Sequence, residues 1–100
     1  MRVAVFINKN KLTAFHDEQI SVVVFDIEND KVVGVENLTL EEQYKKSIEN
    51  WLKHKSINRI YLSEIDNRTY EKLHLNGVEV KTAEALENDG LFKSLALIIS

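Results

Sequence analysis

Cysteine and proline are both absent from this chain of 100 residues, and only three glycines occur in it. Without cysteine, the chain itself supplies no disulfide, no thiol nucleophile and no thiolate ligand for zinc or an iron–sulfur cluster. The glycines, at positions 34, 77 and 90, are too far apart to form a glycine-rich phosphate loop. Thiol chemistry and phosphate-loop nucleotide binding are therefore excluded for this chain.

Long apolar runs and an excess of positive charge are also missing. The longest apolar run, Leu95–Ile99, is far shorter than a membrane span. Only five apolar residues follow Arg2, which is too few for a signal peptide. The net charge is −3, and Lys45, Lys46, Lys53, Lys55 and Arg59 alternate with Glu41, Glu42 and Glu49, as on a solvated helix surface. We expect a cytoplasmic protein with no membrane and no nucleic-acid partner.

The first eight residues, MRVAVFIN, are apolar on both faces of a strand. Val3, Val5 and Ile7 alternate with Ala4 and Phe6. This pattern is typical of a strand in the middle of a sheet with helices above and below it. A length of 100 residues fits one domain spanning positions 1–100.

The order of the remaining elements predicts the sheet. Further strands are expected at Ser21–Ile27, Lys31–Leu38, Asn58–Ile65 and Val78–Lys81, and helices at Leu40–His54, after Asp66 and after Thr82. The first three strands form an antiparallel meander, and the last two, each reached through a helix, are parallel to a neighbour. We therefore predict an α/β fold of ribonuclease-H-like type. Its mixed five-stranded sheet has the order 3-2-1-4-5 in a β-β-β-α-β-α-β-α chain, with helices on both faces.

Four local signals support this arrangement. Glu28-Asn29-Asp30 predicts a tight hairpin turn, and Gly34 predicts a bulge in the following strand. Thr39 and Glu42 have the spacing of a capping box before a helix whose apolar stripe runs from Leu40 to Leu52 and includes Tyr44 and Trp51. Asp66 is a good N-cap for the next helix.

Catalytic residues are not apparent. A two-metal nuclease needs carboxylates that converge on the middle strands, but the first strand has none. We interpret Asp26, Glu28 and Glu64 as solubilising charges at strand ends. His54 and His74 fall near helix ends, whereas His16 follows the central strand, where ligands bind in open α/β sheets. No enzyme is predicted.

Several stretches resemble one known family across nearly the whole chain. They are MRVAVFIN, LTAFHDEQISVVVFDIENDKVVGVEN, IENWLKHKSINRIYLSEI and YEKLHLNGVEVKTAEALE. These are similar to the dinitrogenase iron–molybdenum cofactor biosynthesis proteins, the NifX/NifB C-terminal-like domains. The resemblance implies a non-enzymatic carrier or accessory domain that holds an iron–sulfur or iron–molybdenum cluster and exchanges it with a donor or acceptor protein.

The resemblance also implies a site in the loop Lys9–Gln19. There His16 is expected as the metal ligand, with Phe15, Asn8 and Asp17 as further cofactor contacts. At the place of the family's His-Phe-Gly motif this chain has Phe15-His16-Asp17. This difference favours an alternative, a diverged interaction or regulatory module that has lost the cofactor and forms a homodimer through Leu95–Ile99.

Overall fold

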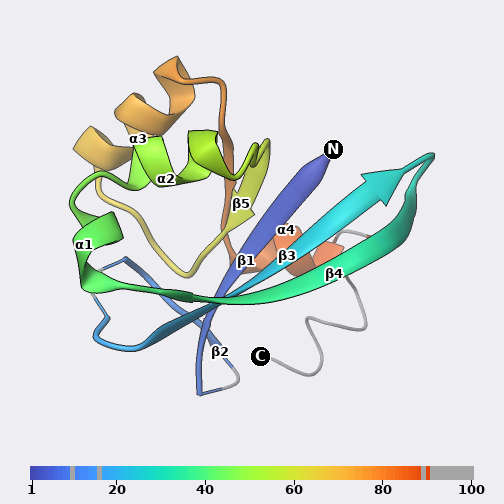
Figure 1. The fold of residues 1–100 in the computed structure, drawn as a ribbon, viewed down its shortest axis with the longest axis horizontal. Helices are drawn as coiled ribbons and strands as arrows, with labels where there is room; N and C mark the ends of the chain where they lie inside the picture. The colour runs from blue at the N-terminus through green and yellow to red at the C-terminus, as the bar shows by residue number, and fades with distance from the viewer. Residues whose placement is uncertain (10, 16, 89, 91–100) are drawn as a thin grey trace.

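The computed structural model describes residues 1–9, 11–15, 17–88 and 90. The elements are β1 (Arg2–Asn8), β2 (Lys11–Leu12), β3 (Ile20–Glu28), β4 (Lys31–Leu40), α1 (Glu42–Lys45), α2 (Ile48–His54), β5 (Arg59–Tyr61), α3 (Asn67–Leu75), β6 (Glu79–Lys81) and α4 (Ala83–Asn88). Figure 1 shows β1 in the middle of the molecule, with the long β3–β4 hairpin on one side of it.

The sheet has the order β4-β3-β1-β5-β6, with β2 as an extra short strand paired to β1. β1 is antiparallel to β3 and parallel to β5, and β5 is parallel to β6. The predicted α/β fold of ribonuclease-H-like type is confirmed, together with its strand order. The sheet has six strands rather than five because β2 was not foreseen.

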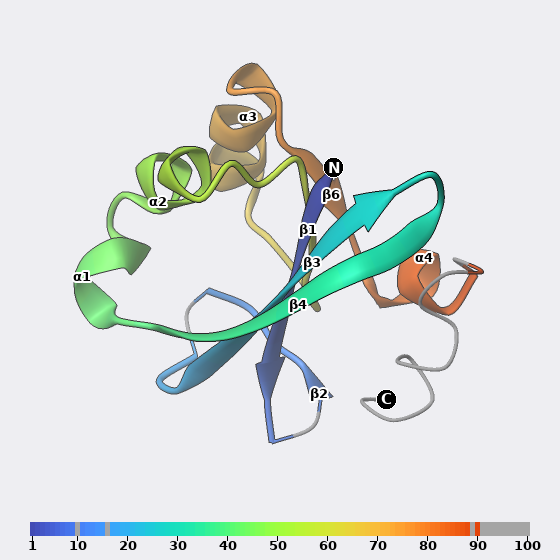
Figure 2. The same cartoon turned by 45° about the vertical axis from the view of Figure 1, so that its right-hand side comes forward.

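The central strand β1 is buried on both faces, as its sequence predicts. Ala4 and Phe6 belong to the larger core, which α2 and α3 cover, and Val3 and Val5 belong to a smaller core with Ala85 of α4 packed against it. Figure 2 shows α1, α2 and α3 on one side of the sheet and α4 on the other. Helices therefore lie on both faces.

The β3–β4 hairpin turns at two residues with left-handed backbones, Asn29 (φ 52°) and Asp30 (φ 62°). The register of the hairpin then shifts between Asp26 and Ile27, opposite Gly34. A Cβ atom at position 34 would lie 3.2 Å from the Asp26 Oδ2 atom, so glycine allows the close approach of the two strands there. The predicted turn and bulge are both confirmed.

The predicted helix Leu40–His54 is wrong at its start, although Glu42–Lys45 is helical. Thr39 and Leu40 continue β4, because they pair with Ser21 and Ile20 of β3. Thr39 therefore cannot cap a helix. The N-cap of α1 is Glu41, whose side chain makes no capping hydrogen bond.

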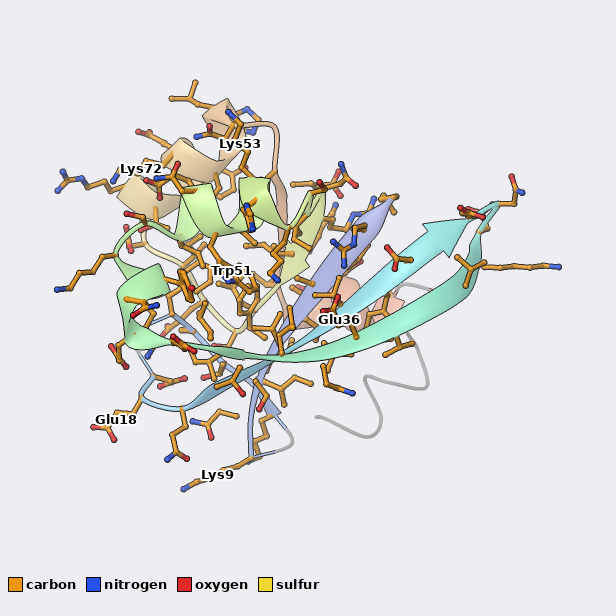
Figure 3. All side chains as sticks on the ribbon, viewed as in Figure 1. Lys9, Glu18, Glu36, Trp51, Lys53 and Lys72 are labelled. Carbon is orange, nitrogen blue, oxygen red and sulfur yellow. The ribbon has the colours of Figure 1, made fainter. Side chains whose placement is uncertain are left out.

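The helical segment is also interrupted between α1 and α2. Ser47 has a non-helical backbone (φ −134°, ψ 53°). No residue of α1 is buried, and Tyr44 is 40% exposed rather than part of the apolar stripe. In α2 the stripe is confirmed, since Ile48, Trp51 and Leu52 are buried. Figure 3 shows Trp51 between the helices and the sheet, whereas Lys53 and Lys72 project from the outer side of the helical layer.

The second half of the chain follows the prediction with shorter elements. The strand expected at Asn58–Ile65 comprises only Arg59–Tyr61, and β6 is an edge strand as expected. No helix in the described ranges is long and apolar enough to cross a membrane. The segment Leu95–Ile99, expected to form a dimer contact, lies outside the described residues.

Candidate functional site

A cleft opens beyond the carboxyl end of β5, beside the second half of β1. Its volume is about 480 Å³, and it is lined by Ala14, Phe15, Lys45, Glu64, Ile65, Asp66 and Thr69. We call this set of residues the β1–β5 cleft. Because ligands in open α/β sheets bind outside the carboxyl ends of the strands, the cleft is the candidate functional site.

Backbone hydrogen bonds fix the inner wall of the cleft. After β2 the chain runs back along β1, and the Thr13 N–H donates to the Phe6 carbonyl at 3.0 Å. The Ser63 N–H in turn donates to the Thr13 carbonyl at 3.0 Å. The segments that carry Phe15 and Glu64 are therefore joined through one buried residue, Thr13, which is 3% exposed.

The apolar part of the wall is an extension of the core. Phe15 packs edge-to-face on Phe6, with ring centroids 5.1 Å apart and an interplanar angle of 87°. Phe6 is completely buried and also contacts Trp51, at a centroid distance of 6.4 Å. The position of the half-buried Phe15 ring is thus set by the core rather than by the loop alone.

Lys45 also lines the cleft and is held by three acceptors. Its ammonium group donates to the backbone carbonyl of Asp17, to that of Glu18 at 3.3 Å and to the Glu42 carboxylate at 2.7 Å. The side chain is only 11% exposed. The interpretation of Lys45 as part of a solvated helix surface is therefore wrong, because this lysine ties α1 to the loop before β3.

Asp66 stands at the mouth of the cleft and begins α3, as the sequence predicts. Its Oδ1 atom accepts from the Thr69 N–H at 2.8 Å, and its Oδ2 atom accepts from the Thr69 hydroxyl at 2.9 Å. These two bonds lower the pKa of Asp66 below its usual value. The side chain therefore presents a carboxylate to the cleft at neutral pH.

This pKa shift predicts a pH dependence of stability. A carboxyl group whose pKa is lower in the folded chain contributes stability above its unfolded-state pKa, and that contribution is lost as the pH falls through the folded-state pKa. We expect the free energy of unfolding of the wild type to exceed that of Asp66→Asn at neutral pH, and this difference to shrink below about pH 4. Asparagine also caps helices, so the variant removes the charge while a side-chain oxygen still accepts from the Thr69 N–H. Urea unfolding across the acid range measures the difference, and a difference that grows in acid would contradict the prediction.

The structure brings together some of the residues that the sequence analysis selected. Phe15 lines the cleft, and Asp17 lies behind Lys45, where its Oδ2 atom accepts from the Ala14 N–H at 3.2 Å. Asn8 is the last residue of β1, pairs with Lys11 and is not among the lining residues. His16, the expected metal ligand, lies outside the described residues.

The sequence analysis did not select Lys45, Asp66 or Thr69 for the site. Asp66 was identified only as a helix cap, and the capping pattern at position 66 was the signal that could have pointed to the cleft mouth. For Lys45 no comparable signal exists, since its position depends on the break after α1 and on the path of residues 17–18.

The carboxylates considered for a two-metal nuclease do not converge. Asp26 pairs with Arg2 at 2.9 Å, at the start of β1, whereas Glu64 lines the cleft beyond the end of β5. Across residues 1–9, 11–15, 17–88 and 90, no group of three or more His, Cys, Asp or Glu side chains could hold a metal ion. Together with the absence of cysteine, this donor set does not fit an iron–sulfur or iron–molybdenum cluster.

Comparison with known proteins supports the fold. No family model matches the sequence, and no curated protein matches it. Among solved structures, the crystal structure of PH0822 has a TM-score of 0.73 and 17% sequence identity, and the match covers 100% of this chain and 93% of that one. A Fowlpox virus resolvase in complex with substrate Holliday junction DNA has a TM-score of 0.43 and 12% identity, covering 82% of this chain and 59% of the resolvase. T. thermophilus RuvC with a Holliday junction substrate has a TM-score of 0.41 and 11% identity, and the match covers 99% of this chain and 91% of the RuvC chain.

These findings correct the family interpretation. The resemblance to the NifX/NifB proteins is wrong, because no family model matches and the similar solved structures are PH0822 and two Holliday junction resolvases. The cofactor carrier with its cluster-exchanging partner and the alternative dimeric module are overturned with it. The expectations of no enzyme and no nucleic-acid partner are also contradicted, since two of these structures are resolvases with junction DNA. For this chain the similarity establishes the fold.

Proposed function

We propose that this domain binds a small organic ligand in the β1–β5 cleft. The observation that carries the proposal is the construction of the cleft. An aromatic ring at Phe15, fixed by the core, lines a space of about 480 Å³ together with polar groups at Lys45, Asp66 and Thr69. Small-molecule sites in proteins are concave and combine apolar side chains with fixed polar groups, and this volume lies in their usual range.

The rigidity of the walls supports the same proposal. Each wall belongs to a different element, and each is held by contacts that do not need a ligand: Phe15 by Phe6, Lys45 by the carbonyls of residues 17 and 18, and Asp66 by Thr69. A preformed site loses little conformational entropy when a ligand binds. Of the residues expected from the sequence, the proposal keeps Phe15 as a ligand contact and Asp17 as a support for Lys45. It also keeps the expected cytoplasmic location.

The proposal predicts that Phe15 is needed for binding and that Tyr70, an aromatic residue of α3 outside the cleft, is not. A mixed library of small amines, acids and neutral compounds is screened against the wild type by thermal shift. For the compounds that bind, we expect Phe15→Ala to lower the affinity about tenfold or more, because a buried aromatic contact is lost. Tyr70→Ala, which removes a 42% exposed ring stacked on His74 outside the cleft, should leave the affinity unchanged.

Circular dichroism verifies that both variants are folded. If Phe15→Ala does not fold, Phe15→Leu, which retains an apolar side chain, takes its place. A library without a single binder, or binders equally affected by the Phe15 and Tyr70 variants, would disprove the proposal.

A further inference from the structure

We infer that the ligand of the β1–β5 cleft is a small organic cation, a primary amine or guanidine attached to an apolar body. The inference rests on the proposed function and names the chemical class that this site selects. It follows from which polar groups of the cleft are already engaged and which still have bonding capacity.

The side-chain donors of the cleft, on Lys45 and Thr69, are engaged. A lysine ammonium group has three N–H donors, and the three acceptors around Lys45 occupy them. The Thr69 hydroxyl donates to Asp66, and the Thr69 N–H is capped by the same carboxylate. The N-terminus of α3, which would otherwise attract an anion, therefore already holds an acid of this chain. An anionic ligand would have to displace these bonds before it could accept from either side chain.

Acceptor capacity remains at the mouth of the cleft. An ionised carboxylate offers about four lone-pair positions, and the two bonds from Thr69 to Asp66 use one on each oxygen. Among the described residues of the lining, the cation Lys45 is already paired with Glu42.

The apolar wall fits the same class of ligand. The Phe15 ring is half-buried against Phe6 and remains part of the cleft surface, beside Ala14 and Ile65. An aromatic ring attracts a cation through its negative face, and a ring next to a carboxylate is a common way to bind ammonium and guanidinium groups. The apolar body of the ligand would pack on Phe15 and Ile65 while its cationic end reaches Asp66.

Three probes that share one body test this inference: 2-phenylethylamine, 3-phenylpropanoate and 2-phenylethanol. Each is titrated into the full chain at neutral pH and followed by amide chemical shifts. We expect the amine to shift the resonances of Phe15, Ile65 and Thr69 saturably, and the acid and the alcohol to bind about tenfold more weakly or less. Added salt should weaken the binding of the amine and leave the binding of the alcohol unchanged.

Asp66→Asn isolates the role of the carboxylate, since asparagine retains the helix cap. It should lower the affinity for the amine about fivefold to tenfold, whereas Asp30→Asn, at the far hairpin turn, should not change it. Equal or tighter binding of the acid or the alcohol in the cleft would overturn the inference while supporting the proposed function. Binding of none of the three probes would overturn the inference, and the library screen then decides the proposed function by itself.

Discussion

Replacing Phe6 by alanine is expected to lower the free energy of unfolding by about 3–5 kcal/mol. The side chain is completely buried in β1, where it contacts Phe15 on one side and Trp51 on the other. The change removes the apolar transfer energy of the ring and leaves a cavity between the sheet and α2. Since a domain of this size has about 5–15 kcal/mol of stability in all, a large part would be lost.

Urea denaturation at equilibrium measures this effect as a shift of the midpoint at an unchanged slope. Phe6→Leu is the matched control, because it retains most of the apolar volume and should cost about 1.5 kcal/mol or less. A cost of Phe6→Ala equal to that of Phe6→Leu would contradict the packing described here, in which Phe6 joins the core to the cleft wall.

Replacing Leu73 by alanine is expected to cost about 2–5 kcal/mol. Leu73 is the only residue of α3 that is buried, and it is completely inaccessible to solvent. The helix that carries Asp66 and Thr69 is therefore anchored to the core at one point. Leu75→Ala is the matched control, because Leu75 is 85% exposed on the same helix and its loss should stay within about 0.5 kcal/mol.

The two leucine variants also separate anchoring from helix propensity, since both introduce alanine into the same helix. The same urea titration measures them. Equal effects at positions 73 and 75 would show that α3 does not depend on its contact with the sheet, and would contradict the account of how Asp66 is positioned.

The sheet could be predicted from the sequence because its signals are strong and local. β1 is apolar at every position from Val3 to Ile7, which only a central strand requires. The hairpin turn and the bulge at Gly34 are fixed by residues whose backbone preferences are intrinsic. The strand order then follows from connection lengths and from the handedness of crossovers.

The helical layer was predicted less well because tertiary pairing overrides local preference. Thr39 and Leu40 have a helix-start pattern, yet pairing with β3 keeps them in the sheet. Likewise β2 has no sequence signal. It forms because Lys9, with a left-handed backbone (φ 53°), turns the chain back so that Leu12 pairs with Ile7.

Only part of the candidate site could be predicted, because the rest depends on tertiary contacts. Phe15 could be selected because it follows the central strand, and Asp66 could be identified as a cap from its spacing to the next helix. The burial of Lys45 depends on the break at Ser47 and on carbonyls more than twenty residues away. No periodicity in the sequence indicates these contacts. The family resemblance could not indicate them either, because the comparisons did not support it.

The most direct test is an amide chemical-shift map of the full chain, recorded during titration with the tightest compound from the library screen. We expect saturable shifts confined to residues 14–15, 45, 64–66 and 69, the lining of the β1–β5 cleft. Saturable shifts centred elsewhere, such as around Arg2 and Asp26 at the opposite end of β1, would contradict the claim that this cleft is the binding site.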